Sequence, residues 1–536
     1  MNSGCMDGTR ARILDEIDAW IKDPEARQIC WIAGLAGTGK TSIAKTVCVR
    51  ASTNPEIMLG GSFFCSRSTG LAAQRDVRCI VPTLIQLLAL ESVDFCLALA
   101  ENIKPGVQYK EVATQVEQLL CTPLLTLTRP HQPILFVIDA LDECGGETSD
   151  GMLDDAKSHA VVANMLEALV GLTRSDPRLP IKFLVTSRPE AQVRDTSISD
   201  EDLSRILQLH AVDAEEVDAD IRRYITQTIT TKLSSRRRLR SMITEEDVEN
   251  LVRLCDGLFI VAATALEHTF GAGADAAVAK FKKLLNASRD SFNAEAAVTL
   301  DRMYALILME AARADGPEAS ELPALLRLLA SVLSARMALS ITALGELLVL
   351  EVYNVRASLS RMHAVVHVPE DDDMPGLRTV HASFGDYLLS RAPDHIRVPR
   401  FFGHETLAQA CLDAMGEHLR FNVSQSASSY EPNSPNRPDS ITLSLEYACL
   451  HWSHHIAVFK SGDDAVSNLP IFDLAIGKLF RPNFMSWLEV LSNLNMVGLA
   501  SGLLLIARST VSRPHTHCIQ TETVTGQGSC FVAVPP

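Results

Sequence analysis

The sequence lacks several features that would place it at once in a class of protein. It has no excess of positive charge, because 49 Lys and Arg stand against 65 Asp and Glu, a formal net charge of −16. Phosphate binding needs a positive face, so this balance argues against duplex nucleic acid as the main partner. None of the 13 cysteines belongs to a C-x-x-C pair, which is typical of free thiols in a reducing compartment.

Long apolar segments are also missing. The N-terminus has no charged segment followed by an apolar run, so nothing indicates a signal peptide. The longest apolar run, residues 496–507, is shorter than the ~20 residues that a membrane-spanning helix needs. The sequence therefore predicts a cytoplasmic protein with no transmembrane segment.

What is present is typical of a globular chain of about three or four domains, since 536 residues are 47% apolar and 21% charged. Apolar runs alternate with helical patterns in the first part of the chain. These runs fall at residues 28–33, 59–65, 134–138, 181–186 and 206–209. Strands that are apolar on both faces and separated by helices indicate an α/β fold with a parallel sheet covered on both sides.

Helical patterns replace strands after residue 212, and a hairpin pattern follows helices further on, which suits a winged helix. A second helical stretch and a segment with little periodicity end the chain. The predicted division is a lead-in helix in 1–26, the α/β domain in 27–212, a helical lid in 213–320, a winged helix in 321–400, a second helical domain in 401–507 and a disordered tail in 508–536.

The strongest motif, Gly34-x-x-x-x-Gly39-Lys40-Thr41, lies between a predicted strand and a predicted helix, as a phosphate-binding loop does. Glycines let several backbone N–H groups point at a phosphate, and the helix N-terminus adds a positive dipole. We expect Lys40, as a solvent-facing ligand, to reach the β- and γ-phosphates, and the Thr41 hydroxyl to bind Mg²⁺. The predicted nucleotide-binding residues are Gly34, Leu35, Ala36, Gly37, Thr38, Gly39, Lys40, Thr41 and Ser42.

Acidic residues follow the predicted strand at 134–138. Asp139, at its carboxyl end, is expected to be the second Mg²⁺ ligand, acting through water. Either Glu143, which we favour, or Asp142 is expected to orient or deprotonate an attacking water. After the next predicted strand, Arg188 is expected to point into the nucleotide crevice and sense the γ-phosphate. The alternatives are an ordinary acidic turn and a surface arginine.

These three motifs together resemble the NACHT class of STAND nucleotide-dependent switch ATPases. Other segments resemble the fungal branch of that class, and the resemblance spans roughly residues 5–507. They are the lead-in with Gly8-Thr9-Arg10 and the stretches at 255–263, 300–304, 381–388, 447–452 and 484–489.

The resemblance implies a signalling switch, such as those of innate immunity, with ATP or ADP and Mg²⁺ as cofactors. ADP is expected to keep the protein closed, while ATP opens it, allows self-association and is hydrolysed slowly. A winged-helix histidine contacts the ADP β-phosphate in related switches, and His381 stands in the matching place. The alternative is that His381 is an ordinary hairpin residue.

The sequence departs from the family in places. Many relatives carry Gly-x-Pro at the helical lid, with the proline packed on adenine, whereas this chain has Gly257-Leu258-Phe259. No effector segment or repeat array is recognisable. Two rival interpretations stay open, a non-catalytic nucleotide-binding scaffold and another P-loop ATPase or kinase. The histidines 451, 454 and 455 lie at helical spacing, which favours an amphipathic helix face over a metal site.

Overall fold

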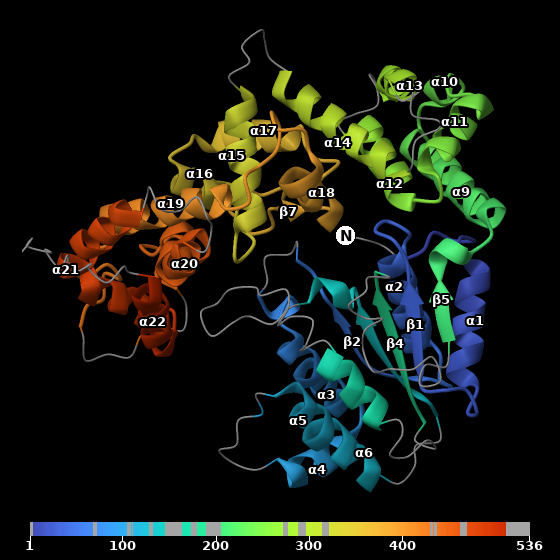
Figure 1. The fold of residues 1–536 in the computed structure, drawn as a ribbon, viewed down its shortest axis with the longest axis horizontal. Helices are drawn as coiled ribbons and strands as arrows, with labels where there is room; N and C mark the ends of the chain where they lie inside the picture. Colours follow the sequence, from blue (N-terminus) through green and yellow to red (C-terminus); the bar gives the residue numbers. More distant parts are fainter. Residues whose placement is uncertain are drawn as a thin grey trace, which may run out of the picture.

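A computed structural model of the chain describes most of its residues. The described residues are 4–67, 72–103, 109, 111–127, 132–144, 163–172, 180–188, 205–271, 277–287, 296–313, 321–428, 433, 437–460 and 469–510. Figure 1 shows two parts, a sheet-containing part below and a chain of helices that arches over it.

The first part is built on a parallel sheet of five strands in the order β2-β3-β4-β1-β5. The strands are β1 (Ile29–Ala33), β2 (Met58–Phe64), β3 (Ile134–Asp139), β4 (Ile181–Ser187) and β5 (Arg205–Gln208). All five match the predicted apolar runs. The central strand β4 is buried along its whole length, as expected for a sheet covered on both faces.

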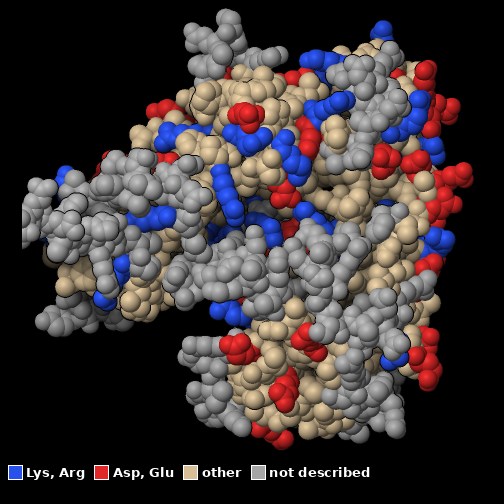
Figure 2. All heavy atoms as spheres, viewed as in Figure 1, with Lys and Arg blue, Asp and Glu red and all other residues tan. Residues whose placement is uncertain are grey.

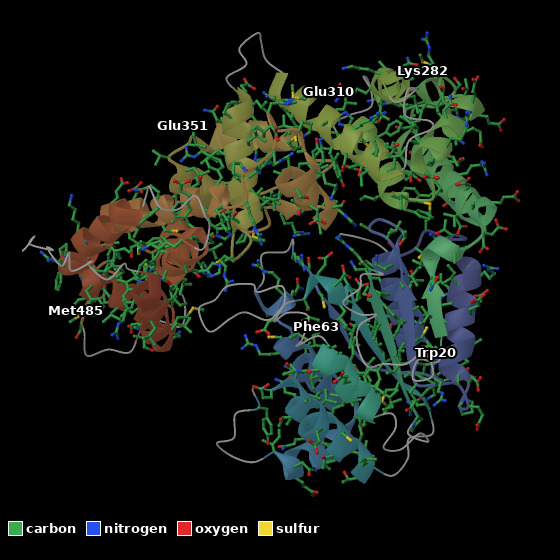
Figure 3. All side chains as sticks on the ribbon, in the orientation of Figure 1. Trp20, Phe63, Lys282, Glu310, Glu351 and Met485 are labelled. Carbon is green, nitrogen blue, oxygen red and sulfur yellow. The ribbon has the colours of Figure 1, made fainter. Side chains whose placement is uncertain are left out.

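Helices cover both faces because successive strand residues point to opposite sides. Cys30 and Ile32 of β1 pack with α1 and α2, whereas Ile29 and Trp31 pack with α3, η3 and the helix at 163–172. Trp20 of α1 and Phe63 of β2 mark the two faces in Figure 3. The remaining elements of this part are α1 (Ala11–Lys22), α2 (Lys40–Thr53), η1 (Ala72–Gln74), η2 (Val77–Cys79), α3 (Ile80–Glu91), α4 (Val93–Asn102), α5 (Val112–Thr114), η3 (Gln115–Cys121), α6 (Thr122–Thr126), η4 (Leu141–Glu143) and η5 (Leu209–Ala211).

Helices follow the sheet, as the loss of strand patterns predicts. They are α9 (Ala214–Lys232), α10 (Arg237–Arg240), α11 (Glu245–Cys255), α12 (Phe259–Phe270), α13 (Ala277–Ala287) and α14 (Ala296–Arg313). A capping box in which Thr244 and Asp247 exchange side-chain and backbone bonds starts α11. Asp256 and Gly257, both left-handed, turn the chain into α12.

The next elements have the order of a winged helix. They are α15 (Glu321–Ser334), α16 (Ile341–Leu348), α17 (Val352–Ser360), the antiparallel strands β6 (Val366–His367) and β7 (Arg378–Thr379), and then α18 (Ala382–Asp386) with η7 (Tyr387–Arg391). The α/β class with following helical segments is therefore confirmed. In Figure 1, α18 lies on the side of the helical arch that faces the sheet.

The described chain ends in α19 (Phe402–His418), α20 (Leu443–Lys460), α21 (Leu469–Asn493), η9 (Val497–Leu499) and α22 (Ala500–Thr510). The expected tail after residue 507 begins within α22, and residues 511–536 lie outside the described residues. Across the described helices, none combines the length and the apolar character needed to cross a bilayer.

A chain of hydrogen bonds joins these last helices to the sheet-containing part. Arg75 donates to the carbonyl of Arg336 (3.3 Å), whose backbone N–H donates to the Tyr447 hydroxyl (3.2 Å). That hydroxyl lies 2.8 Å from Nε2 of His455, whose Nδ1 is 2.9 Å from Nδ1 of His404. With the Tyr447 hydroxyl assigned as the donor to Nε2 of His455, the Nδ1–H of His455 donates to Nδ1 of His404.

The histidines of α20 are therefore not the amphipathic face that their spacing suggests. His454 and His455 are buried, 7% and 0% exposed, and no group of three or more His, Cys, Asp or Glu side chains within the described ranges is arranged to bind a metal. Burial, with Arg336 and Arg75 nearby, lowers the pKa of His404 to about 4 and that of His451 to about 3. The cluster is neutral at pH 7.

We expect this cluster to make the protein acid-labile. The folded pKa of His404 lies below the unfolded value of about 6.5, so the unfolded chain binds more protons below that pH. The contribution of His404 to the free energy of unfolding is fully present above about pH 6.5 and is lost as the pH falls toward 4. One such histidine lowers the free energy of unfolding by up to about 2 kcal/mol at pH 5. Thermal melts at pH 7 and pH 5 should show a smaller pH effect in His404→Gln than in the wild type. Equal pH effects in the two proteins would contradict this.

Candidate nucleotide site

A glycine loop connects β1 to α2 at the carboxyl edge of the sheet. Gly37 and Gly39 have φ of 82° and 93°, a left-handed backbone that side chains rarely adopt. Helix α2 begins at Lys40, whose Nζ donates to the carbonyls of Gly34 (2.7 Å) and Leu35 (3.0 Å). Lys40 is 8% exposed, so the expectation of a solvent-facing ligand is wrong. The ammonium lies inside the loop because two carbonyls there replace its water.

The loop also contacts the helical part. The backbone N–H of Ile260, in the first turn of α12, donates to the Gly37 carbonyl (3.2 Å). A Cβ built on Gly37 would approach Cγ2 of Ile260 to 2.1 Å, a contact that no packing tolerates. Gly37 is thus required by its backbone angle and by the closeness of α12.

Arg10, which belongs to the stretch Gly8-Thr9-Arg10 and has no role predicted from the sequence, also contacts the glycine loop. Its Nη2 donates to the Thr38 carbonyl (3.0 Å), its backbone N–H to Asp220 (2.9 Å), and its guanidinium carbon lies 4.9 Å from the Phe259 ring centre. Arg10 is 3% exposed, yet Nε and Nη1 have no hydrogen-bond partner among the described residues. Buried donors of this kind are costly unless a ligand satisfies them. Phe259, at the position of the lid proline, thus contacts Arg10.

Asp139 and Thr41 come together, as expected for two groups around one metal ion. Asp139 ends β3, is 1% exposed, and accepts a hydrogen bond from the Thr186 hydroxyl (2.6 Å). The Thr41 side chain also hydrogen-bonds the Asp139 carboxylate. Burial raises the pKa of Asp139 despite these bonds, because a carboxylate at the edge of the sheet is poorly solvated. A hydroxyl and a carboxylate are ligands that suit Mg²⁺.

The two acidic residues of η4 have different partners. Asp142 accepts from the backbone N–H of Arg188 (3.0 Å) and lies 3.2 Å from its Nε. Glu143 accepts from the backbone N–H of Arg67 (3.0 Å), and burial raises its pKa to about 7. Asp142 is committed to an ion pair with Arg188, whereas the backbone N–H of Arg67 is the hydrogen-bond partner that the described residues provide to the Glu143 carboxylate.

Arg188 bridges the sheet to the winged helix. Besides Asp142, both of its terminal nitrogens lie 3.2 Å from one carboxylate oxygen of Asp386, at the end of α18. Nearby carboxylates raise the pKa of Arg188 against its partial burial. The position at the end of β4 is the one predicted, whereas no sequence motif marks Asp386 as the partner of Arg188.

His381 caps the N-terminus of α18. Its Nδ1 accepts from the backbone N–H of Ser383 (3.1 Å) and lies 2.7 Å from that residue's hydroxyl, so the ring proton is assigned to Nε2. Burial, with the charges of Arg188 and Lys40, lowers the pKa of His381 to about 4. His381 is therefore neutral at pH 7, and its Nε2–H is the donor of the ring.

All the charged residues predicted for the site act on Lys40. Burial lowers the pKa of Lys40 below its usual value, and the positive charge of Arg188 adds to this effect. The carboxylates of Asp142, Asp139 and Glu143 oppose it without reversing it. In Figure 2, Lys and Arg side chains are spread over the visible surface, and several of them lie where the helical arch meets the sheet-containing part; Asp and Glu are frequent along the right-hand edge of the molecule. The acidic net charge of the chain thus coexists with positive side chains at this junction.

The fold is an α/β P-loop fold followed by helical segments. The family described as "Nephrocystin 3, N-terminal" matches residues 8–188, about a third of the chain. No curated protein matches the chain in sequence. Similar solved structures include a STAND ATPase with a tetratricopeptide repeat sensor from Pyrococcus horikoshii (TM-score 0.40, 13% identity) and Drosophila ORC bound to DNA (TM-score 0.31, 14% identity).

The alignments cover 95% of this chain and 59% of the Pyrococcus chain, and 71% of this chain and 95% of the Drosophila chain. The protein therefore spans about three fifths of the length of the STAND structure. At these TM-scores the likeness assigns no role to any residue.

We expect Lys40→Ala to abolish nucleotide binding. Alanine removes the ammonium that neutralises phosphate, and it leaves two loop carbonyls without their donor, so a modest loss of stability accompanies the effect. Calorimetric titration with Mg²⁺–ATP measures the binding.

Lys182 provides the matched control. It is 3% exposed and its Nζ donates to the carbonyls of Asp23 (2.8 Å) and Ala26 (2.7 Å), near the start of β4 and away from the loop. Lys182→Ala should lower the melting temperature without loss of binding. If Lys40→Ala binds ATP as tightly as the wild type, the assignment of the loop is wrong.

Proposed function

We propose that the protein is a nucleotide-dependent switch of the STAND kind, in its NACHT class. In this proposal it binds ADP or ATP with Mg²⁺, hydrolyses ATP slowly and self-associates in the ATP state. The segments 27–212, 213–320, 321–400 and 401–507 serve as its nucleotide-binding, lid, winged-helix and second helical domains.

One observation carries the proposal. Segments about 200 residues apart meet at the carboxyl edge of the sheet, because Ile260 of α12 bonds to Gly37 of the glycine loop while Asp386 of α18 pairs with Arg188 at the end of β4. An enzyme that only turns over ATP has no need to tie its helical segments to the loop. A switch needs such contacts, since a ligand shifts a conformational equilibrium only through contacts that differ between the states.

The chemistry proposed for the site follows from its charges. Lys40 and the backbone N–H groups of the loop bind the phosphates, and Thr41 with Asp139 hold Mg²⁺, which would neutralise phosphate charge. Glu143 takes a proton from the attacking water. Arg188 senses the γ-phosphate, and the Nε2–H of His381 donates to the β-phosphate of ADP.

The nucleotide that remains bound after purification tests the proposal. ADP in stoichiometric amount, with ATP-dependent assembly in sedimentation experiments, would support a switch. Binding without hydrolysis or assembly would favour a nucleotide-binding scaffold, and rapid turnover without assembly would favour an ordinary ATPase or kinase.

We expect ATP hydrolysis to rise with pH through about 7. Glu143 must be ionised to accept a proton, and its pKa of about 7 means that the ionised fraction grows roughly tenfold between pH 6 and pH 8. Single-turnover rates over this range measure the effect. Glu143→Gln should abolish the rise and slow hydrolysis while ATP affinity changes little. A rate defect in Asp142→Asn but not in Glu143→Gln would exchange the two roles.

We expect His381→Ala to weaken ADP relative to ATP by about ten- to a hundredfold, the worth of one hydrogen bond to a charged group. The self-associated fraction should rise in parallel, as followed by sedimentation. His381→Ser is the matched control, because serine retains an acceptor for the Ser383 N–H and so keeps the cap of α18. Both variants should lose the ADP preference, whereas only His381→Ala should lose the cap. An unchanged ADP-to-ATP ratio in both would leave His381 as a capping residue alone.

A further inference from the structure

Both hydrogen-bonding edges of the Arg188 guanidinium are in use. Its Nε lies 3.2 Å from Asp142, and Nη1 and Nη2 both lie 3.2 Å from Oδ2 of Asp386. These contacts take three of the five N–H groups of an arginine and leave one on each terminal nitrogen, on opposite sides of the group. A phosphate that binds this side chain through two adjacent N–H groups must therefore replace one of the two carboxylates.

The two carboxylates are not equally easy to displace. Asp142 has a side chain only 7% exposed and also accepts from the Arg188 backbone (3.0 Å), so losing its partner would leave a buried charge uncompensated. The Asp386 side chain is 37% exposed, and water replaces its partner at low cost. Asp386 is the one that leaves.

Loss of the Arg188–Asp386 pair would also change how the winged helix contacts the sheet. Asp386 ends the same short helix, α18, that His381 begins, and that helix otherwise contacts α14 through the Tyr304 hydroxyl, 2.8 Å from Ser383. Across the described residues, Arg188–Asp386 is an ion pair that joins this helix directly to the sheet.

We propose that Asp386 disfavours ATP relative to ADP at this site, by occupying the pair of Arg188 N–H groups that a γ-phosphate would engage. This rests on the proposed function, because it assumes that nucleotide binds at the glycine loop. ATP has to displace the Asp386 carboxylate, which frees α18 from the sheet. ADP, which lacks the γ-phosphate, leaves the pair intact.

Thermodynamic linkage fixes the direction of the effect. If ATP binding breaks the pair, then removing the carboxylate must tighten ATP by the factor that the pair contributes. A partly exposed ion pair is worth up to about fivefold in an equilibrium constant. ADP affinity, which does not involve the pair, stays as in the wild type.

The experiment is a pair of titrations, with Mg²⁺–ADP and with a non-hydrolysable Mg²⁺–ATP analogue, on wild type and three variants. Asp386→Asn should bind the ATP analogue about fivefold more tightly with ADP unchanged. Asp386→Glu, which keeps a carboxylate, should behave as the wild type. Asp301→Asn is the matched control, because Asp301 pairs with Arg391 of η7 (2.9 Å) without touching Arg188, and it should change neither affinity.

The outcomes separate this inference from the function beneath it. If the wild type binds neither nucleotide, the role of Asp386 and the proposed function are both wrong. If the wild type binds both and Asp386→Asn alters ADP and the ATP analogue equally, or alters neither, the role of Asp386 is wrong while the switch stands. An equal effect of Asp301→Asn would also overturn it, because the loss of any carboxylate near α18 would then suffice.

Discussion

The burial of one ammonium group at the carboxyl edge of the sheet constrains everything around it. Lys40 is enclosed by its own loop and held by two carbonyls, so its charge is poorly solvated and has to be compensated by fixed groups. Asp139, Asp142 and Glu143 supply negative charge from the end of β3. Those carboxylates in turn need partners, which are Thr186, Arg188 and the backbone of Arg67. Each partner fixes another segment of the chain near the loop.

The sheet makes this convergence possible. In a parallel arrangement the carboxyl ends of neighbouring strands meet at one edge, and β3, β4 and β1 are adjacent in the order β2-β3-β4-β1-β5. Asp139, Arg188 and the glycine loop therefore come together, although they are far apart in the sequence, between residues 34 and 188. The helical segments add a second layer of contacts from the opposite side, through Ile260 and Asp386.

The strands and the glycine loop were predictable because their signals are local. An apolar run of five or six residues and a glycine spacing depend on neighbouring residues alone. The partners of charged groups were not, because they depend on how distant segments dock. Nothing near Asp386 marks it as the partner of Arg188, and nothing near Arg10 shows that Phe259 lies against it. The burial of Lys40 and of the α20 histidines was also missed, since polar residues at helical spacing resemble a solvent-facing surface.

The contact of Ile260 with Gly37 has a kinetic consequence. The first turn of α12 rests on the loop where a single methyl group would already collide with it, so the loop cannot move toward α12 unless that helix moves away. Any ligand whose release moves the loop in that direction must wait for the displacement of a packed helix, and such collective motions occur in microseconds to milliseconds or more slowly. The lifetime of a bound molecule would then be set by the rigidity of α12 and its neighbours rather than by the strength of the contacts to the ligand itself.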